Sequence, residues 1–170
     1  MFGWIRRWLL GEPKNAINAQ STLTVRHLVP DGKGGFTEAL GDRRVVKNKC
    51  VTDVFVNLLV DALHTAGYLN AFKYHDSGTG TVAEAATDTA LGTPCGEARD
   101  VGTQTEGASA NIYKSVATHT YGGTFSITEH GLFDAATVGN LADRTKFASV
   151  GVANGEKIEF TYELTVNSGG

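Results

Sequence analysis

Apolar residues occupy every second position near the end of the chain, from Ile158 to Val166, and charged residues or threonines lie between them. Successive side chains of a β-strand point to opposite faces of its sheet. One face of this segment is therefore expected to be buried and the other solvated, which is typical of an antiparallel sheet.

A period of two recurs in shorter segments, which glycine-, threonine- and asparagine-rich turns separate. Asn154-Gly155 predicts a hairpin turn before the last strand, because both residues accept a positive φ. The pattern predicts a mainly β fold, with an antiparallel β-sandwich or jelly-roll-like body. The other predicted strands cover residues 22–26, 36–40, 43–49, 72–75, 112–119, 125–133 and 146–152.

One segment has helical spacing instead. Its apolar residues recur three or four positions apart, which predicts one amphipathic helix over residues 52–66 that lies on a sheet. Thr52 is expected to cap the first turn, and Gly67 to end the helix in a left-handed conformation.

The beginning of the chain differs from the rest. We divide it into an N-terminal arm with its linker, residues 1–20, and a β-rich body, residues 21–170. A helix in the arm would have fewer than three turns and would end at Gly11-Glu12-Pro13, so it needs a surface on which to fold. Residues 14–21 have the polar composition of a linker.

The arm has the side chains of an interface anchor, since indole rings are favoured there. Docking onto another chain is the preferred interpretation; folding back on the body and lying on a membrane surface are the alternatives. The residues expected to make this contact are Phe2, Trp4, Ile5, Arg6, Arg7, Trp8 and Leu9.

The amino-acid composition and the net charge limit the classes of protein to which the chain can belong. Hydrophobic residues make up 41% and charged residues 19%, as in a globular protein, and the formal net charge is −3. This small acidic excess argues against nucleic acid as the main partner. No stretch approaches the ~20 apolar residues of a membrane span, and Arg6 and Arg7 interrupt the run that a signal peptide would need.

The residues that could support catalysis do not form a catalytic pattern. His75, Asp76 and Ser77 are adjacent, whereas a hydrolytic triad brings distant segments together, so we expect an Asp-Ser-Gly turn. The glycine-rich segment 78–81 lacks the Gly-Lys-Ser/Thr ending of a phosphate loop. The chain is predicted to be no enzyme.

No cofactor or metal site is predicted either. Cys50 and Cys95 are expected to be reduced thiols, although they could pair. Glu129-His130 is expected to be a surface or hydrogen-bonding feature. Carboxylates between residues 84 and 106 are expected to be solvated, and their spacing matches no calcium-loop pattern.

Four segments between Phe72 and the C-terminus form a recognisable set, namely YHDSGTGTVAEAATDTAL (74–91), GTQTEGASANIYKSVAT (102–118), ITEHGLFD (127–134) and LADRTKFASVGVANGEKIEFTYELTV (141–166). Together they resemble virion proteins of tailed bacteriophages, namely head decoration or cement proteins and tail-fibre-like proteins. The resemblance covers Phe72 to the C-terminus.

This resemblance implies a sandwich or jelly-roll that sits on a shell or tail as a symmetric homo-oligomer, often a trimer. The expected function is that of a cement protein, made in the bacterial cytoplasm, which binds the outside of the phage head and stabilises contacts between major capsid proteins. The alternatives are a tail, baseplate or head-fibre component, and a glycan-binding surface module. Loop 92–110, where a glycan site would need aromatic residues, contains none.

Overall fold

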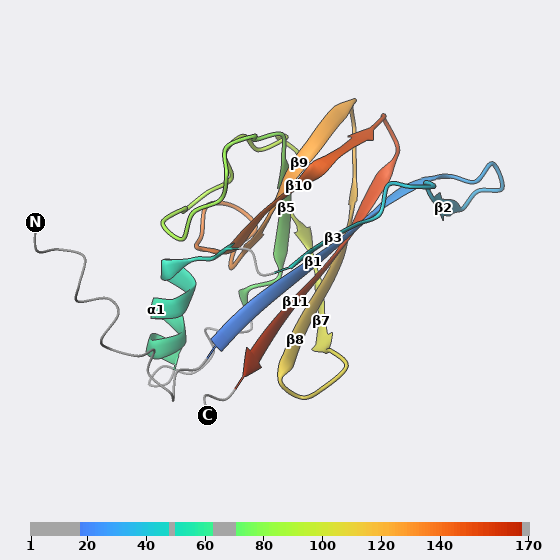
Figure 1. Cartoon of the computed structure of the whole chain (residues 1–170). Coiled ribbons are helices and arrows are strands. Elements are labelled where there is room, and N and C mark those ends of the chain that lie inside the picture. Colours follow the sequence, from blue (N-terminus) through green and yellow to red (C-terminus); the bar gives the residue numbers. More distant parts are fainter. Residues whose placement is uncertain (1–17, 48–49, 63–70, 168–170) are drawn as a thin grey trace, which may run out of the picture.

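The computed structural model describes residues 18–47, 50–62 and 71–167, which form a mainly β fold with one helix (Figure 1). The helix is α1 (Asp53–Ala62). The strands are β1 (Asn18–Pro30), β2 (Phe36–Glu38), β3 (Arg44–Lys47), β4 (Cys50–Val51), β5 (Tyr74–Gly78), β6 (Asp100–Val101), β7 (Thr103–Glu106), β8 (Ile112–Thr120), β9 (Phe125–Phe133), β10 (Leu141–Val152) and β11 (Lys157–Asn167).

The strands form two antiparallel sheets. One has the order β2-β1-β11-β8-β7, with β3 also paired to β1, and the other has the order β4-β10-β9-β5-β6. Buried apolar residues of both sheets form a shared core, so the body is a β-sandwich, as the alternating pattern predicts.

The last strand is central to this core. β11 pairs with β1 on one side and with β8 on the other. Its residues Ile158, Phe160, Tyr162 and Leu164 are buried, whereas Val166 remains 38% exposed. The predicted alternation of β11 is confirmed, because a sheet flanked by solvent on one face buries only the other.

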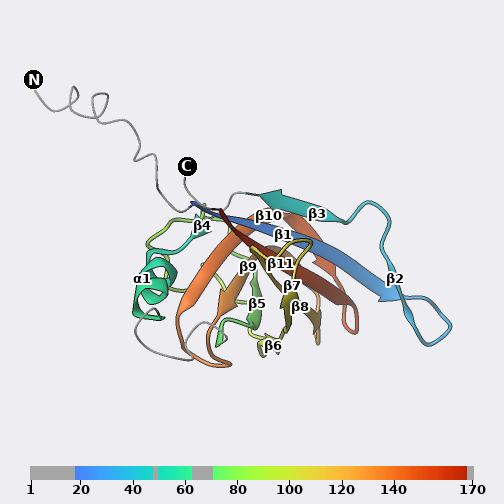
Figure 2. The same ribbon diagram turned by 90° about the horizontal axis from the view of Figure 1, so that it is seen from below.

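The helix begins where the sequence predicts. The Thr52 hydroxyl accepts a hydrogen bond from the Phe55 N–H (3.3 Å), which caps the first turn. Phe55 is buried, and α1 packs on β10 at the end of the sandwich opposite the β1–β2 hairpin (Figures 1 and 2). The predicted end of the helix at Gly67 lies outside the described residues.

The turn before β11 differs from the prediction. Asn154 and Gly155 do form a turn, with a φ of 85° at Gly155, but β10 and β11 belong to different sheets. The predicted hairpin is therefore wrong. Both flanking strands have one apolar face, and they bury these faces against each other across the core instead of pairing edge to edge.

Three segments contain more strand than expected. β1 begins at Asn18, inside the predicted linker, because it pairs with β11 as far as Asn167. β5 includes Asp76 and Ser77, so the predicted turn there is wrong. The segment 92–110 contains β6 and β7, which extend the edges of the two sheets.

Candidate functional site

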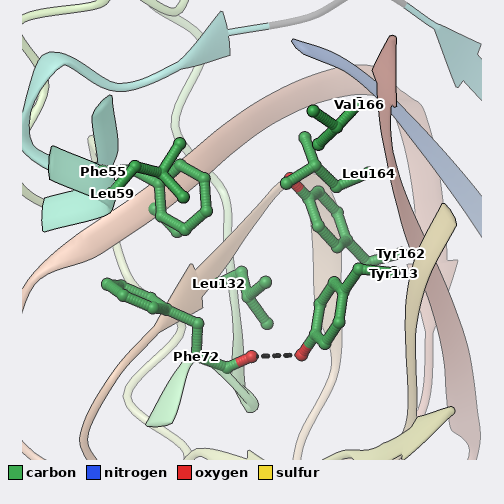
Figure 3. A pocket seen from close by; sticks show the side chains of 9 residues that line it. Phe55, Leu59, Phe72, Tyr113, Leu132, Tyr162, Leu164 and Val166 are labelled. Carbon is green, nitrogen blue, oxygen red and sulfur yellow. Dashed lines mark hydrogen bonds between the residues drawn. The ribbon is translucent and has the colours of Figure 1, made fainter. Parts of the chain in front are cut away.

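A cavity in the described part of the chain lies between α1 and the two sheets (Figure 3). It has a volume of about 190 Å³, and its walls are apolar. The helix contributes Phe55 and Leu59, β8 contributes Tyr113, and β11 contributes Tyr162 and Val166. We call this cavity the apolar pocket.

One of the two tyrosine hydroxyls of the lining residues has a hydrogen-bond partner. The Tyr113 hydroxyl donates a hydrogen bond to the Phe72 carbonyl (Figure 3). The proton of the Tyr113 hydroxyl is therefore already engaged, and the apolar walls suit an apolar or aromatic side chain better than a polar ligand.

The apolar surface continues beyond the pocket. A shallower depression of about 560 Å³ follows β7 and the start of β8, and its lining includes Gln104 and Ile112. Tyr113 and Val166 line both hollows. The edge of the sandwich at this end thus offers a larger apolar area than the pocket alone.

The chain enters the body beside this surface. In the β1–β11 ladder Ala19 lies opposite Val166, and Asn18 lies opposite Asn167. The start of β1 therefore lies next to Val166, which lines the pocket. The predicted contact residues Phe2, Trp4, Ile5, Arg6, Arg7, Trp8 and Leu9 lie outside the described residues.

Three adjacent residues of β5, His75, Asp76 and Ser77, have separate hydrogen-bond partners. His75 contacts His130 and Ser115, Asp76 accepts a hydrogen bond from Arg99 (3.0 Å), and Ser77 accepts one from Tyr121 (3.0 Å). Neighbours on a strand face opposite sides, so each side chain has its own partners, as the sequence predicts.

His75 and His130 form a buried polar link inside the sandwich. His75 Nδ1 lies 2.9 Å from His130 Nε2, and His75 Nε2 lies 2.8 Å from the Ser115 hydroxyl on the other sheet. Burial lowers the pKa of His75 to about 3 and also lowers the pKa of His130. Both rings are therefore neutral at pH 7, and the link is a hydrogen-bonded one.

Of the two alternatives expected for Glu129 and His130, the surface position is wrong, since both side chains are fully buried, and the hydrogen-bonding role is confirmed. Glu129 pairs with Arg144, whose Nη2 lies 2.6 Å from Glu129 Oε2. No spacing in the sequence links these two residues, because strand pairing between β9 and β10 brings them together.

Two of the acidic residues predicted to be solvated have partners, although their side chains remain 24% and 39% exposed. Asp88 binds Arg144 (2.8 Å), and Asp100 lies against His119 (2.5 Å). Both cysteines are free thiols, as expected. Among the residues that the structure describes, no group of histidine, cysteine and carboxylate side chains could hold a metal ion, and no helix is long and apolar enough to cross a membrane.

No known protein family, curated protein or solved structure matches the chain.

Proposed function

We propose that the protein is a non-enzymatic structural component of a tailed-bacteriophage particle, acting as a cement protein on the outside of the head shell. The single observation that carries the proposal is the apolar pocket beside the point where an aromatic arm enters the body. The resemblance of residues 72–170 to decoration proteins supports the same assignment.

The chemistry of the pocket matches that of the arm. An exposed apolar cavity is stabilised by an occupant that removes its walls from water. Trp4 and Trp8 supply large apolar rings of the kind that hold most of the binding energy at interfaces. We propose that the arm of one copy fills the pocket of its neighbour.

Such an exchange is a head-to-tail contact. Contacts of this kind close into rings when the rotation between copies allows it, and a small ring agrees with the oligomer that the resemblance implies. Contacts repeated around a shell add buried area between capsid proteins and stabilise the assembled state by mass action.

A second surface of the body, at the β1–β2 hairpin, is proposed to contact the head shell. The β1–β2 hairpin extends away from the sandwich at the end opposite α1 (Figure 1). Phe36 is 41% exposed, and Leu40 in the following loop is fully exposed. Apolar side chains at an extended tip are suited to contact with another protein, so the hairpin is proposed to meet the major capsid protein.

The arm and the pocket are tested with separate variants. Deleting residues 1–10 and the single change Val166→Glu at the lip of the pocket should each abolish self-association in sedimentation velocity experiments. The double change Trp4→Ala and Trp8→Ala should have much of the same effect. Val45→Glu is the matched control, because Val45 is 51% exposed on β3 and does not line the pocket.

The same variants should bind less well to phage heads that lack this protein, as measured by co-sedimentation. Arg6→Ala should act more weakly and in a salt-dependent way, as exposed charges do. Unchanged self-association and head binding by the truncated chain would contradict the proposal. Unfolding of the truncated chain would place the arm in the core of its own domain.

A further inference from the structure

A buried polar group of the apolar pocket has no hydrogen-bond partner among the described residues. Tyr162 lies on β11 with 2% of its surface exposed, and its side chain lines the pocket. Figure 3 shows its hydroxyl on the side of the ring that faces the helix residues Phe55 and Leu59. No described residue forms a hydrogen bond with this hydroxyl. Buried hydroxyls are normally paired, so this one points to a partner that binds in the pocket.

The second tyrosine of the lining, Tyr113, is already paired. Its hydroxyl donates to the Phe72 carbonyl and accepts a hydrogen bond from the side-chain amide of Gln104 (2.8 Å). A buried water makes about two to four hydrogen bonds, and the other lining side chains are apolar. The pocket therefore suits an occupant that fills the apolar space and brings one polar atom to Tyr162 better than it suits water.

The volume of the pocket limits the size of that occupant. The pocket measures about 190 Å³. An apolar cavity of about 150 Å³ binds benzene, whereas sites for drug-sized molecules measure about 300–1,000 Å³. The pocket thus has room for a molecule of one ring or two fused rings.

Aromatic rings line two sides of the pocket (Figure 3). Phe55 and Phe72 meet edge to face, with 5.1 Å between their ring centroids and 84° between their planes. Tyr113 and Tyr162 form a second pair, with 6.4 Å between centroids and 61° between planes. Aromatic rings favour such edge-to-face and offset contacts with one another. A flat aromatic molecule can therefore extend both pairs, which a saturated chain cannot do.

The surroundings favour an uncharged molecule. None of the lining residues is charged, and burying a charge without a partner is strongly unfavourable. Burial raises the pKa of Tyr162, and the negative charge of Asp143 raises it further, so the hydroxyl stays protonated at pH 7. A neutral hydroxyl can both donate and accept a hydrogen bond.

We propose that the apolar pocket binds one small, uncharged aromatic molecule of the indole class, with the Tyr162 hydroxyl accepting a hydrogen bond from the N–H of that molecule. This inference rests on the proposed function, because it concerns the same pocket, and it adds the class of ligand and the polar contact. The side chains of Trp4 and Trp8 end in the same ring. A free indole therefore competes with the arm of a neighbouring copy, and self-association becomes sensitive to dissolved aromatic molecules.

The test titrates indole and indene into the full chain by isothermal titration calorimetry. The two molecules have the same shape, but indene lacks the N–H. Indole should bind with a Kd on the order of 0.1–1 mM, as expected for a ligand of so few atoms. It should bind about two- to tenfold more tightly than indene, which is the effect of one hydrogen bond.

The polar contact is tested with two tyrosine variants. Tyr162→Phe removes only the hydroxyl, so the affinities for indole and indene should become equal. Tyr121→Phe is the matched control, because the buried Tyr121 donates to Ser77 and does not line the pocket. It should keep the preference for indole. A folded Tyr162→Phe chain with an unchanged preference would remove the Tyr162 hydroxyl from the site.

The location of the site is tested on the helix. Leu59→Trp places a large ring in the pocket and should abolish indole binding. Val56→Trp is its control, because Val56 is 48% exposed on the same helix and does not line the pocket. Indole binding by a folded Leu59→Trp chain would overturn the proposal. Two wild-type results would overturn it without any variant, namely no saturable binding of indole, or equal affinities for indole and indene.

Sedimentation velocity distinguishes this inference from the proposed function. If indole binds but self-association persists at saturating indole, the contact between arm and pocket is wrong, and the ligand site is supported. If indole does not bind but Val166→Glu abolishes self-association, the ligand site is wrong, and the contact between arm and pocket is supported.

Discussion

The Nε atom of Arg144 lies 2.8 Å from Oε2 of Glu129, and both side chains are buried on the neighbouring strands β9 and β10. Glu129 also accepts hydrogen bonds from the N–H groups of Gly80 (3.0 Å), Gly92 (3.1 Å) and Thr93 (2.8 Å). One carboxylate thus fixes the loop after β5 to the sheet, and the hydrogen bonds that this carboxylate accepts are charge-assisted.

Replacing Glu129 should show how much this contact stabilises the fold. Glu129→Gln leaves the Arg144 guanidinium buried with half of its charge compensation removed. Breaking one partner of a buried pair costs about 3–5 kcal/mol, so urea denaturation should show a loss of this order. Glu159→Gln is the control. Its pair with Arg26 is partly exposed, and the expected loss is about 0–1 kcal/mol. Equal losses of stability in Glu129→Gln and Glu159→Gln would contradict the conclusion that the buried pair with Arg144 stabilises the fold more.

Gly80 should tolerate no side chain. A Cβ at this position would overlap with the Glu129 carboxylate, which the surrounding N–H groups hold in place. Gly80→Ala should therefore cost about 1–3 kcal/mol, as overpacking does. A Cβ at Gly151 meets no atom within 4 Å, so Gly151→Ala should change stability by less than about 0.5 kcal/mol in the same thermal melts.

Phe160 should be among the most costly residues to truncate. It is 1% exposed, and its ring centroid lies 4.7 Å from that of His130 and 6.4 Å from that of Phe147. Phe160→Ala should lower the free energy of unfolding by about 3–5 kcal/mol. Phe36→Ala removes the same ring from a position that is 41% exposed, and its effect should be much smaller. Similar losses would mean that β11 is peripheral.

Acid should weaken the fold through the buried histidines. The pKa of His75 falls from 6.5 to about 3 on folding, and that of His130 falls in the same direction. Between these values only the unfolded chain takes up the proton, so stability is lost as pH falls below about 6.5. Each histidine contributes a slope of at most about 1.4 kcal/mol per pH unit. Denaturation midpoints that stay constant from pH 7 to pH 5 would contradict this prediction.

The Asp143 carboxyl should have the opposite effect on the pH dependence of stability. Burial raises its pKa from 3.8 to about 6, so the folded chain binds a proton more readily than the unfolded chain. Above about pH 6 the folded chain therefore holds a buried, charged carboxylate that lowers its free energy of unfolding, and this loss disappears as pH falls. Asp143→Asn should raise the free energy of unfolding at pH 8, by about 1–3 kcal/mol, and the gain should vanish near pH 4.

Asp31 provides the control for this pH trend. Hydrogen bonds from the Lys33 and Gly35 N–H groups lower the pKa of its exposed carboxyl. Asp31→Asn should therefore lose stability at neutral pH and match the wild type in acid. The same pH trend in both variants would mean that burial does not set the pKa of Asp143.

The local periodicity of the chain determined much of the fold. Alternation from Ile158 to Val166 predicts β11, and the Thr52 hydroxyl with the apolar positions after it predicts the start of α1. These features depend on residues a few positions apart. The side-chain periods of strands and helices are therefore sufficient to predict them.

The tertiary structure decided which strands pair and which polar residues are buried. Periodicity tells which side chains share a face, but it does not identify the strand beside them, so the Asn154-Gly155 turn joins two sheets instead of closing a hairpin. The chain alone likewise gave no sign that Glu129 would meet Arg144, or that α1 and β11 would enclose a pocket. Burial of a polar group depends on partners that only long-range packing supplies.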